Sequence, residues 1–273
     1  WDYVDEDLVR EKRAQETCLK IYLSDDEAGA KQYAALRTSL ENLKARDEEH
    51  AWGRLVTETA LTRQEDWEWG WKQYFKPFPV GHSFMIKPSW ETVDDAQGRR
   101  ILEIDPASSF GTGSHATTRL CLQALEQHIH GGEKVLDLGC GSGILSIAAL
   151  LLGAKDAFAC DIDDKCVGVA YENAALNGVG KEHYTVRAGD VLSDKKLQKE
   201  FGGDYDVIVA NIVADVIIAL APQVGKLLKK GGIFLCSGII DDRADEVREK
   251  LVEAGWTIEE TRSSEGWFSY LCR

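Results

Sequence analysis

The sequence contains no long apolar run and no excess of basic residues. Its longest apolar stretch, ILSIAALLLGA at 144–154, falls short of the roughly 18 residues that a membrane-spanning helix needs, so no membrane association is expected. With 32 Lys and Arg against 46 Asp and Glu, the formal net charge is −14. A protein that binds nucleic acid meets its phosphates with a basic face, so this balance disfavours direct nucleic-acid binding. It suits a basic protein partner instead.

Cysteine usage excludes another class of protein. The seven cysteines include no C-x-x-C pair and their number is odd, which predicts reduced, buried thiols in a cytoplasmic protein rather than a disulfide framework. His128 and His130 are two residues apart, which is not a metal-ligand spacing, so no metal is expected. The chain starts at Trp1 without a signal peptide, and we expect that some N-terminal sequence precedes it. We expect a monomer.

A regular alternation of strands and helices begins at about residue 101 and predicts an α/β fold. The expected strands are 134–138, 156–160, 184–187, 206–210 and 232–237, and the expected helices are 143–152, 164–176, 214–229 and 241–254. This alternation is typical of a doubly wound, Rossmann-like parallel sheet. The last segment, WTIEETRSSEGWFSYLCR, reads as two strands without a helix between them, which predicts a C-terminal antiparallel hairpin.

The first sixty residues predict a smaller, separate α+β domain. CLKIYLS at 18–24 alternates like a half-buried strand, and RLVTETAL at 54–61 reads as a second strand. Between them, Ser24 and Glu27 form a capping box for a helix. One stripe of that helix carries Tyr33, Leu36, Leu40 and Leu43. A β-α-β unit of this kind is half of a ferredoxin-like domain, so we expect a partial one here.

An aromatic segment, residues 65–91, joins the two regions. Trp67 and Trp71 are four residues apart and can share one helical face, with Tyr74 and Phe78 nearby. Such a helix could contact substrate, but an aromatic helix packed between two domains is the favoured interpretation. Residues 94–100 predict a surface turn. We therefore expect an N-terminal recognition domain at 1–62, a linker helix and connecting segment at 63–95, and a catalytic domain at 96–273.

The motif DLGCGSG at 137–143 predicts a nucleotide-binding turn between a strand and a helix. Gly139 and Gly141 allow close approach of a ligand, but Ile144 stands where a dinucleotide fingerprint needs its third glycine. Asp137, two residues before the first glycine, would repel a pyrophosphate. The turn therefore favours a ligand that lacks phosphate and carries positive charge, such as S-adenosylmethionine.

Three further side chains follow predicted strands on the ligand side of the sheet. Asp161 ends the second strand, 22 residues after Gly139, where an acidic residue accepts the two ribose hydroxyls. Asp190 follows the third strand and could meet an adenine amino group or serve as a turn aspartate; both interpretations stay open. Asn211 ends the fourth strand, where its amide oxygen can accept a hydrogen bond from an amine and orient it toward a methyl group.

The stretch DPASSFGTGSHATT at 105–118 precedes the glycine turn and contains a second glycine-rich loop. Gly111 and Gly113 permit a sharp turn, and Thr117 and Thr118 at the start of the next helix provide hydroxyl and backbone donors for a carboxylate. This loop is predicted to cover the amino-acid end of the cofactor. His115 is expected to order the loop rather than act as a general base.

These motifs together resemble one family. FGTGSHATT, LDLGCGSGILSIAALLLGA, DID, NIVAD and EDWEWGWKQYFKPFPVG are similar to segments of the ribosomal protein L11 methyltransferase (PrmA) family. The resemblance implies transfer of methyl groups to lysine ε-amines and an N-terminal α-amine of that ribosomal protein, which an N-terminal domain recognises. The cofactor contacts that it implies fall on Thr118, Gly139, Asp161 and Asn211.

Two other classes of enzyme are weighed against this one. A methyltransferase that acts on a nucleic-acid base tends to carry Asn-Pro-Pro-aromatic after the fourth strand, whereas this chain has Ile212, Val213 and Ala214. A small-amine substrate remains an alternative. A nicotinamide-dependent oxidoreductase would need a glycine at Ile144, and a catalytically inactive interaction module would bind no cofactor.

Overall fold

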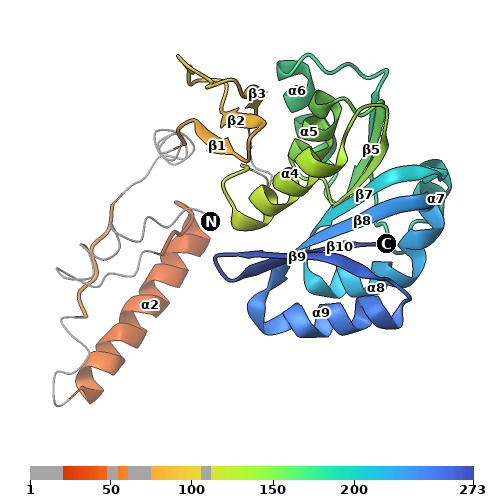
Figure 1. Cartoon of the computed structure of the whole chain (residues 1–273). Helices are drawn as coiled ribbons and strands as arrows, with labels where there is room; N and C mark the ends of the chain where they lie inside the picture. The colour runs from red at the N-terminus through yellow and green to blue at the C-terminus, as the bar shows by residue number, and fades with distance from the viewer. Residues whose placement is uncertain (1–20, 48–54, 61–74, 106–111) are drawn as a thin grey trace. The chain divides into compact units, whose positions relative to one another are not determined.

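The structure is a computed structural model, which describes residues 21–47, 55–60, 75–105 and 112–273 (Figure 1). The chain divides between Gln73 and Tyr74 into two compact units. Trp67, Trp71 and Tyr74, and with them the expected aromatic helix, lie outside the described residues. The same holds for Gly111 of the predicted loop.

The first unit is described mainly through helix α2, Glu27–Arg46. Asp26 is its N-cap: Oδ1 of Asp26 accepts a hydrogen bond of 2.8 Å from the backbone N–H of Gly29. Ser24 donates its hydroxyl to the same oxygen, also at 2.8 Å. The predicted capping box between Ser24 and Glu27 is therefore wrong, because the nearer carboxylate of Asp26 satisfies the helix start and complements its partial positive charge.

The two strands predicted for this unit are absent from its described residues. Residues 21–24 and 55–60 have no strand structure, and Ile21 and Tyr22 are 49% and 60% exposed. The prediction of a β-α-β unit is thus wrong for these described residues. Alternating apolar and polar residues form a strand only where a neighbouring strand accepts and donates the backbone hydrogen bonds. Three residues of the predicted stripe on α2 are half-buried, Tyr33, Leu36 and Leu40, whereas Leu43 is 37% exposed.

The second unit opens with a small sheet that sequence patterns did not predict. It contains β1 (Phe78–Val80), β2 (Phe84–Lys87) and β3 (Arg100–Glu103) in that order, with β2 antiparallel to β1 and parallel to β3. The predicted turn at 94–100 leads into β3. Glu126 on the neighbouring helix accepts the hydroxyl of Ser83 at 2.7 Å, which ties this sheet to the rest of the second unit.

The main sheet has seven strands in the order β6-β5-β4-β7-β8-β10-β9. The parallel strands are β4 (Lys134–Leu138), β5 (Asp156–Asp161), β6 (Tyr184–Ala188), β7 (Tyr205–Asn211) and β8 (Leu228–Ile240). Strands β9 (Ile258–Ser264) and β10 (Trp267–Cys272) form the predicted antiparallel hairpin, and β10 lies between β9 and β8. The doubly wound, Rossmann-like sheet is therefore confirmed. The strand order reverses between β4 and β7, the place where such sheets bind ligands.

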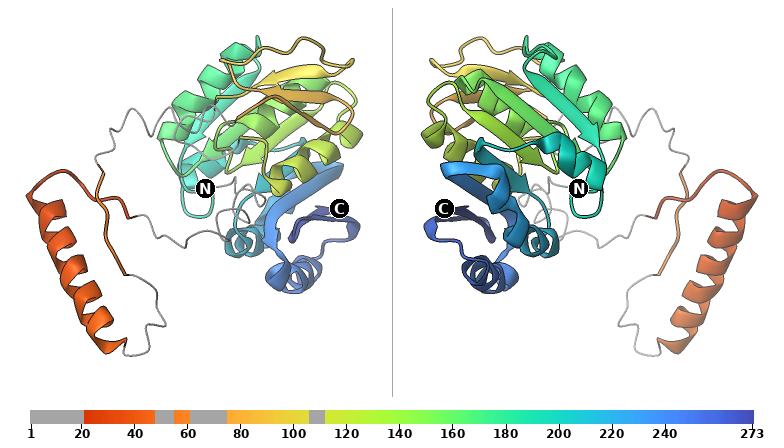
Figure 2. Two further views of the ribbon diagram at one scale, coloured as in Figure 1. Left: turned by 90° about the vertical axis from the view of Figure 1, so that its left-hand side faces the viewer. Right: turned by 90° about the vertical axis from the view of Figure 1, so that its right-hand side faces the viewer.

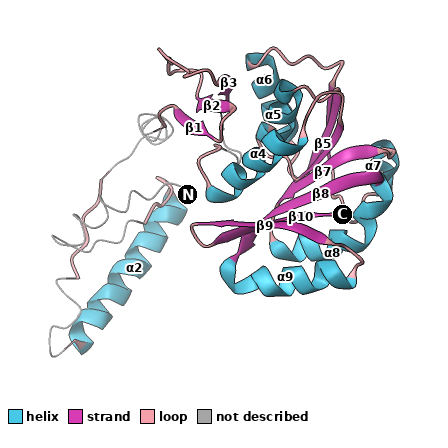
Figure 3. Ribbon diagram, in the orientation of Figure 1, coloured by secondary structure: helices cyan, strands magenta, loops and turns pink. Residues whose placement is uncertain are grey.

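Helices cover both faces of this sheet (Figures 2 and 3). On one face lie α4 (Ala116–His128), α5 (Ile144–Leu152) and α6 (Lys165–Leu176); on the other lie α7 (Lys195–Phe201), α8 (Ala214–Val224) and α9 (Asp241–Glu253). The predicted helix 214–229 is too long, because a 3-10 turn, Gly225–Leu227, follows α8 and β8 begins at Leu228. Helix α7 was not predicted.

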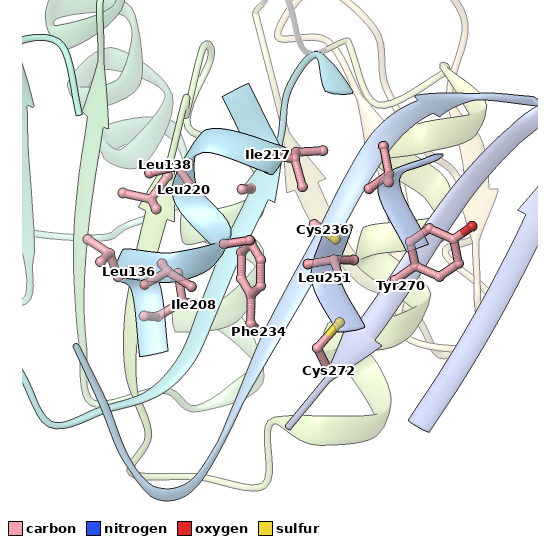
Figure 4. Close-up of a cluster of buried hydrophobic side chains, with 14 of the residues drawn as sticks. Leu136, Leu138, Ile208, Ile217, Leu220, Phe234, Cys236, Leu251, Tyr270 and Cys272 are labelled. Carbon is pink, nitrogen blue, oxygen red and sulfur yellow. The ribbon is translucent and has the colours of Figure 1, made fainter. Parts of the chain in front are cut away.

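The main core lies between the sheet and the helices α7, α8 and α9 (Figure 4). Leu136 and Leu138 of β4 point into this core, and so do Ile208 of β7 and Cys236 of β8. Side chains alternate between the faces of a sheet, so the residues next to these point the other way. Asp137, Asn211 and Ser237 therefore face the α4, α5 and α6 side, where the predicted ligand site is built.

Candidate active site

The glycine turn and the end of β7 meet at the point where the strand order reverses. Asp137 of β4 is directly opposite Val209 of β7, two residues before Asn211. Gly139 has a φ of +80°, and a Cβ there would lie only 2.3 Å from Cγ2 of Ile212. Only glycine fits this turn without a shift of Ile212. The backbone of the turn is thereby brought close to Ile212, the residue that follows Asn211.

Asp161 and the glycine turn are joined directly. The backbone N–H of Gly141 donates to Oδ2 of Asp161 at 2.8 Å, and that of Asp163 donates to Oδ1 at 3.0 Å. Gly139 and Cys140 also donate to the carbonyl of Cys160, at 2.8 and 3.0 Å. Each oxygen of an ionised carboxylate can accept more than one hydrogen bond, so both remain able to accept a ribose hydroxyl.

Asp137 lies beneath the glycine turn and is fully buried. Its Oδ2 accepts two hydrogen bonds from Ser146 in the first turn of α5, from the backbone N–H at 3.1 Å and from the hydroxyl at 2.8 Å. Its Oδ1 is buried and has no hydrogen-bond partner among the described residues. Burial raises the pKa of Asp137 to about 7, and the hydrogen bonds from Ser146 only partly oppose this.

Ser146 and Tyr184 support the turn, although sequence reasoning missed them. The hydroxyls of these two fully buried side chains are 3.0 Å apart, so Asp137, Ser146 and Tyr184 form a chain of polar groups. A Cβ on Gly143 would lie 2.6 Å from the hydroxyl of Tyr184, which packs directly under the turn. A serine inside the apolar run of α5 was the available signal. Tyr184 of β6 becomes the partner of this serine through the order of the strands in the sheet, which the sequence around Ser146 does not reveal.

Asn211 is tied to the start of α4. Its Nδ2 donates to Oγ1 of Thr118 at 3.3 Å, and Thr118 is 3% exposed. This bond uses the amide nitrogen and leaves Oδ1 of Asn211 as the acceptor that can meet an amine N–H. The two residues are distant in sequence, and the structure brings them together at the carboxyl end of β7.

His115 is the N-cap of α4. Its Nδ1 lies 2.8 Å from Oγ1 of Thr117, and its ring contacts Trp267 edge to face with 4.8 Å between the ring centroids. Ser237, another residue that the sequence did not single out, donates its hydroxyl to the carbonyl of Phe268 at 3.2 Å and lies 3.4 Å from the carbonyl of Thr117. Both contacts tie the start of α4 to the C-terminal hairpin.

Asp190 has the contacts of a turn aspartate. Its Oδ1 accepts the N–H of Leu192 at 2.9 Å and its Oδ2 accepts the hydroxyl of Ser193 at 2.5 Å. The hydrogen bond from Ser193 is the main cause of the lowered pKa of Asp190. The backbone N–H of the preceding Gly189 donates to the carbonyl of Asp161 at 2.8 Å, so this turn adjoins Asp161.

Within the described residues, no group of three or more His, Cys, Asp and Glu side chains is arranged to hold a metal ion. The helices in the same part of the chain include none with the length and apolarity to cross a membrane. The six described cysteines are all free and buried.

The fold and the site together define a class of enzyme. A glycine turn over a buried carboxylate, an aspartate at the end of the next strand and a sheet that reverses its order between β4 and β7 fit a cationic nucleoside rather than a dinucleotide. The orphaned Oδ1 of Asp137 is the observation that favours a positively charged ligand, and no phosphate would be stable beside it. The protein is an S-adenosylmethionine-dependent methyltransferase.

The chain belongs to the ribosomal protein L11 methyltransferase (PrmA) family, whose model matches residues 1–273. A ribosomal protein L11 methyltransferase from Heliobacterium modesticaldum is 42% identical over 255 residues, 93% of this chain and 78% of the relative. One from Caldanaerobacter subterraneus subsp. tengcongensis is 38% identical over 282 residues, 100% of this chain and 84% of the relative. A solved ribosomal protein L11 methylase from Lactobacillus delbrueckii subsp. bulgaricus is similar with a TM-score of 0.66 and 32% identity, over 73% of this chain and 98% of that one.

Proposed function

We propose that this protein transfers methyl groups from S-adenosylmethionine to lysine ε-amines and the N-terminal α-amine of ribosomal protein L11. The observation that carries this proposal is the position of Asn211, beside the glycine turn and held by Thr118. The match to the family over the whole chain supports the identity of the protein substrate. We further propose a cytoplasmic monomer that binds no nucleic acid, which its free cysteines and net charge of −14 favour.

In this proposal, different residues bind different parts of the cofactor. Asp161 accepts the ribose hydroxyls, while Gly139 and Gly141 let the backbone come close. Thr118 and the N-terminal end of α4 meet the carboxylate of the methionine moiety. Asp137 provides negative charge beneath the cationic end, and Asp190, whose turn adjoins Asp161, is assigned to the adenine amino group.

The substrate amine must be neutral when it reacts, because its lone pair attacks the methyl carbon in line with the bond to sulfur. When bound, the cofactor supplies a methyl group activated by a cationic sulfur. A lysine amine of pKa about 10.4 loses its proton at a cost of about 4 kcal/mol at pH 7.4, whereas an α-amine near pKa 8 costs far less. Desolvation beside a positive charge lowers the amine pKa and recovers part of that cost.

Asn211 orients the neutral amine in this mechanism. With Nδ2 donated to Thr118, Oδ1 of Asn211 accepts one amine N–H and directs the lone pair toward the methyl group. No side chain has to act as a strong base. His115 is not assigned that role, because its Nδ1 caps α4 and its ring packs on Trp267.

The segment after β7 argues against a nucleic-acid base as substrate. Val213 is 64% exposed there and offers no aromatic ring on which a flipped base could stack. A protein or small-molecule amine requires no such platform. The family match favours the protein amine.

The proposal is tested by methyl transfer to purified ribosomal protein L11, with the modified residues located by mass spectrometry. Asn211→Ala should lower kcat about a hundredfold or more, a larger factor than the rise in the dissociation constant of S-adenosylmethionine, because its contact with the amine matters mainly in the transition state. Gln223→Ala, which removes an exposed amide on α8, is the matched control and should behave like the wild type. No methylation of L11 by the wild type would contradict the substrate, and a wild-type rate in Asn211→Ala would contradict the role of Asn211.

A further inference from the structure

Asn173 on α6 is a fully buried side chain that joins two separate stretches of backbone in the second unit. Its Nδ2 donates to the carbonyl of Ser142 in the glycine turn at 2.9 Å, and its Oδ1 accepts the backbone N–H of Asp105 at 2.8 Å. A buried amide is costly unless its polar atoms are hydrogen-bonded, and here the two ends of one rigid group bond to different stretches. A displacement of one stretch is therefore transmitted to the other.

The chain on both sides of the segment 106–111 is held in place. The carboxylate of Asp105 accepts the backbone N–H of Ser89 at 2.8 Å and its hydroxyl at 2.5 Å. After the segment, Gly113 has a φ of +83°, and a Cβ there would lie 2.8 Å from Cδ1 of Ile144, the first residue of α5. Asp105 and Gly113 are thus both tied to elements that adjoin the glycine turn, Asp105 through Asn173 and Gly113 through Ile144.

Asn177, four residues after Asn173, has a different role on the same helix. Its Oδ1 accepts the N–H of Glu103 at 2.9 Å and its Nδ2 donates to the carbonyl of Glu103 at 2.7 Å, so its amide pairs with β3 as a neighbouring strand would. Its Nδ2 also donates to the carbonyl of Asn173 at 2.8 Å. These contacts hold the small sheet, and none of them is with the glycine turn.

The two stretches that Asn173 joins serve different ends of the cofactor in the proposed function. The glycine turn adjoins Asp161, assigned to the ribose, and the chain continues from Asp105 to Thr118, assigned to the methionine carboxylate. We propose that Asn173 is a positioning residue, which sets the spacing between these two ends and so favours a ligand that spans both. It acts through the backbone and does not touch the ligand. The inference rests on the proposed function, because it takes this place as the site of S-adenosylmethionine.

Two ligands distinguish the spacing from the turn alone. S-adenosylmethionine reaches both ends of the site, whereas 5′-methylthioadenosine has the same adenosyl group without the amino-acid end. Asn173→Ala removes both hydrogen bonds and should weaken the binding of S-adenosylmethionine about tenfold. The affinity for 5′-methylthioadenosine should stay within about threefold of the wild type. Calorimetric titration of the whole chain with each ligand measures these values.

Two further variants separate the amide from packing and from general stability. Asn173→Leu keeps nearly the same side-chain shape without polar atoms, so it should lose S-adenosylmethionine affinity much as Asn173→Ala does. Asn177→Ala is the matched control, because it removes hydrogen bonds from the same helix without touching the turn. It should lower the unfolding midpoint and bind both ligands as the wild type does. All titrations are made below the unfolding midpoint of each variant.

Hydrogen exchange of the wild type gives a test that needs no variant. The backbone N–H of Asp105 is held by Asn173, and that of Glu103 by Asn177. Addition of S-adenosylmethionine should slow the exchange of the Asp105 amide several-fold, because a ligand that fixes the spacing also fixes this hydrogen bond. The exchange of the Glu103 amide should not change.

The outcomes separate this inference from the proposed function. Equal losses for both ligands in Asn173→Ala, or wild-type binding of S-adenosylmethionine in Asn173→Ala or Asn173→Leu, would overturn the positioning role. A loss in Asn177→Ala as large as in Asn173→Ala would also overturn it, because general loosening would then explain both. If neither Asn173 variant folds, an Asp105 amide that does not respond to S-adenosylmethionine would overturn it. Failure of the wild type to bind S-adenosylmethionine would instead overturn the proposed function.

Discussion

Helix α2 and strand β4 show two different ways in which a segment of this chain is held. In α2, 20 residues long, Gly29 is the one buried residue, and its support includes the Asp26 cap and the exposed pairs Lys31–Glu27 and Arg37–Glu41. Such pairs contribute only about 0.3–0.5 kcal/mol each. In β4, four of five residues are buried in the sheet. The comparison teaches that the second unit is stabilised by its own core, and all the residues that we propose for the cofactor site lie in this unit.

Removal of the first unit gives the largest expected effect. A fragment that starts at Tyr74 keeps β1–β3, the main sheet and every cofactor residue, so its affinity for S-adenosylmethionine should stay within about twofold of the whole chain. Its methylation of ribosomal protein L11 should fall by roughly 10²–10⁴-fold at low substrate concentration, because a tethered recognition unit raises the effective concentration of the substrate. Methyl incorporation and cofactor titration of both proteins measure the two quantities.

Two outcomes would change the comparison between the units. Equal incorporation by the fragment and the whole chain would show that the first unit does not recognise the substrate. Loss of cofactor binding in the fragment would show that the catalytic unit extends before Tyr74.

The next largest effect concerns the stability of the second unit. The folded pKa of Asp137 is about 7, above the unfolded value near 3.9, so the folded state binds more protons between these values and stability falls as pH rises through this window. At 1.36 kcal/mol per unit, the loss is at most about 4 kcal/mol above pH 7. Asp137→Asn cannot ionise, so relative to the wild type the cofactor-free variant should gain roughly 2–4 kcal/mol between pH 5 and pH 8. Urea unfolding at both pH values measures this gain. If the free energy of unfolding changed equally with pH in the two proteins, Asp137 would be ionised in the free protein at both pH values.

A smaller effect is expected at the ribose site. Asp161→Ala should weaken S-adenosylmethionine binding by about 1.5–3 kcal/mol, the range for hydrogen bonds to a charged group, and it also removes the acceptor that holds Gly141. Titration calorimetry gives the dissociation constant. Asp163→Ala is the matched control on the same loop, and an unchanged constant in Asp161→Ala would remove Asp161 from the ribose site.

The smallest effect is expected in the first unit. Asp26→Ala removes the cap of α2 and should destabilise that helix by about 1 kcal/mol, without any change in the unfolding midpoint of the second unit. Hydrogen exchange of α2 amides and thermal unfolding measure the two parts separately. A lower midpoint for the second unit would mean that the two units unfold together.

The same contrast explains what the sequence predicted well. Each parallel strand of the main sheet contains an apolar run bounded by glycine or polar residues, so this sheet, most of its helices and the positions of Gly139, Asp161 and Asn211 could be predicted. The strands expected at 18–24 and 54–61 had alternation but no identified neighbour, and their described residues form no strand. Alternating apolar and polar residues indicate which face of a strand could be buried, but they do not identify the element that packs against that face.

Other parts of the structure depend on contacts between residues distant in sequence, which the pattern of neighbouring residues does not reveal. Strand β2 is four residues long, lies between turns and pairs with β3, sixteen residues on, so FMIK had no recognisable strand signature. The contact of Ser146 with Tyr184 spans 38 residues and follows from the order of the strands. Asp190 was placed correctly after its strand, but only the structure shows that Leu192 and Ser193 donate to its carboxylate.

The position of β10 in the sheet has a consequence for synthesis of the protein on the ribosome. Residues 267–272 are translated after the other described strands of the main sheet, yet they lie between β8 and β9 rather than at an edge. Until they emerge, the thirteen residues of β8 present an unpaired edge, and such edges pair readily with other chains. The sheet of the second unit is therefore complete only after β10 has been translated, and a chain stopped before Trp267 would be a substrate for chaperones and proteases rather than a weakened enzyme.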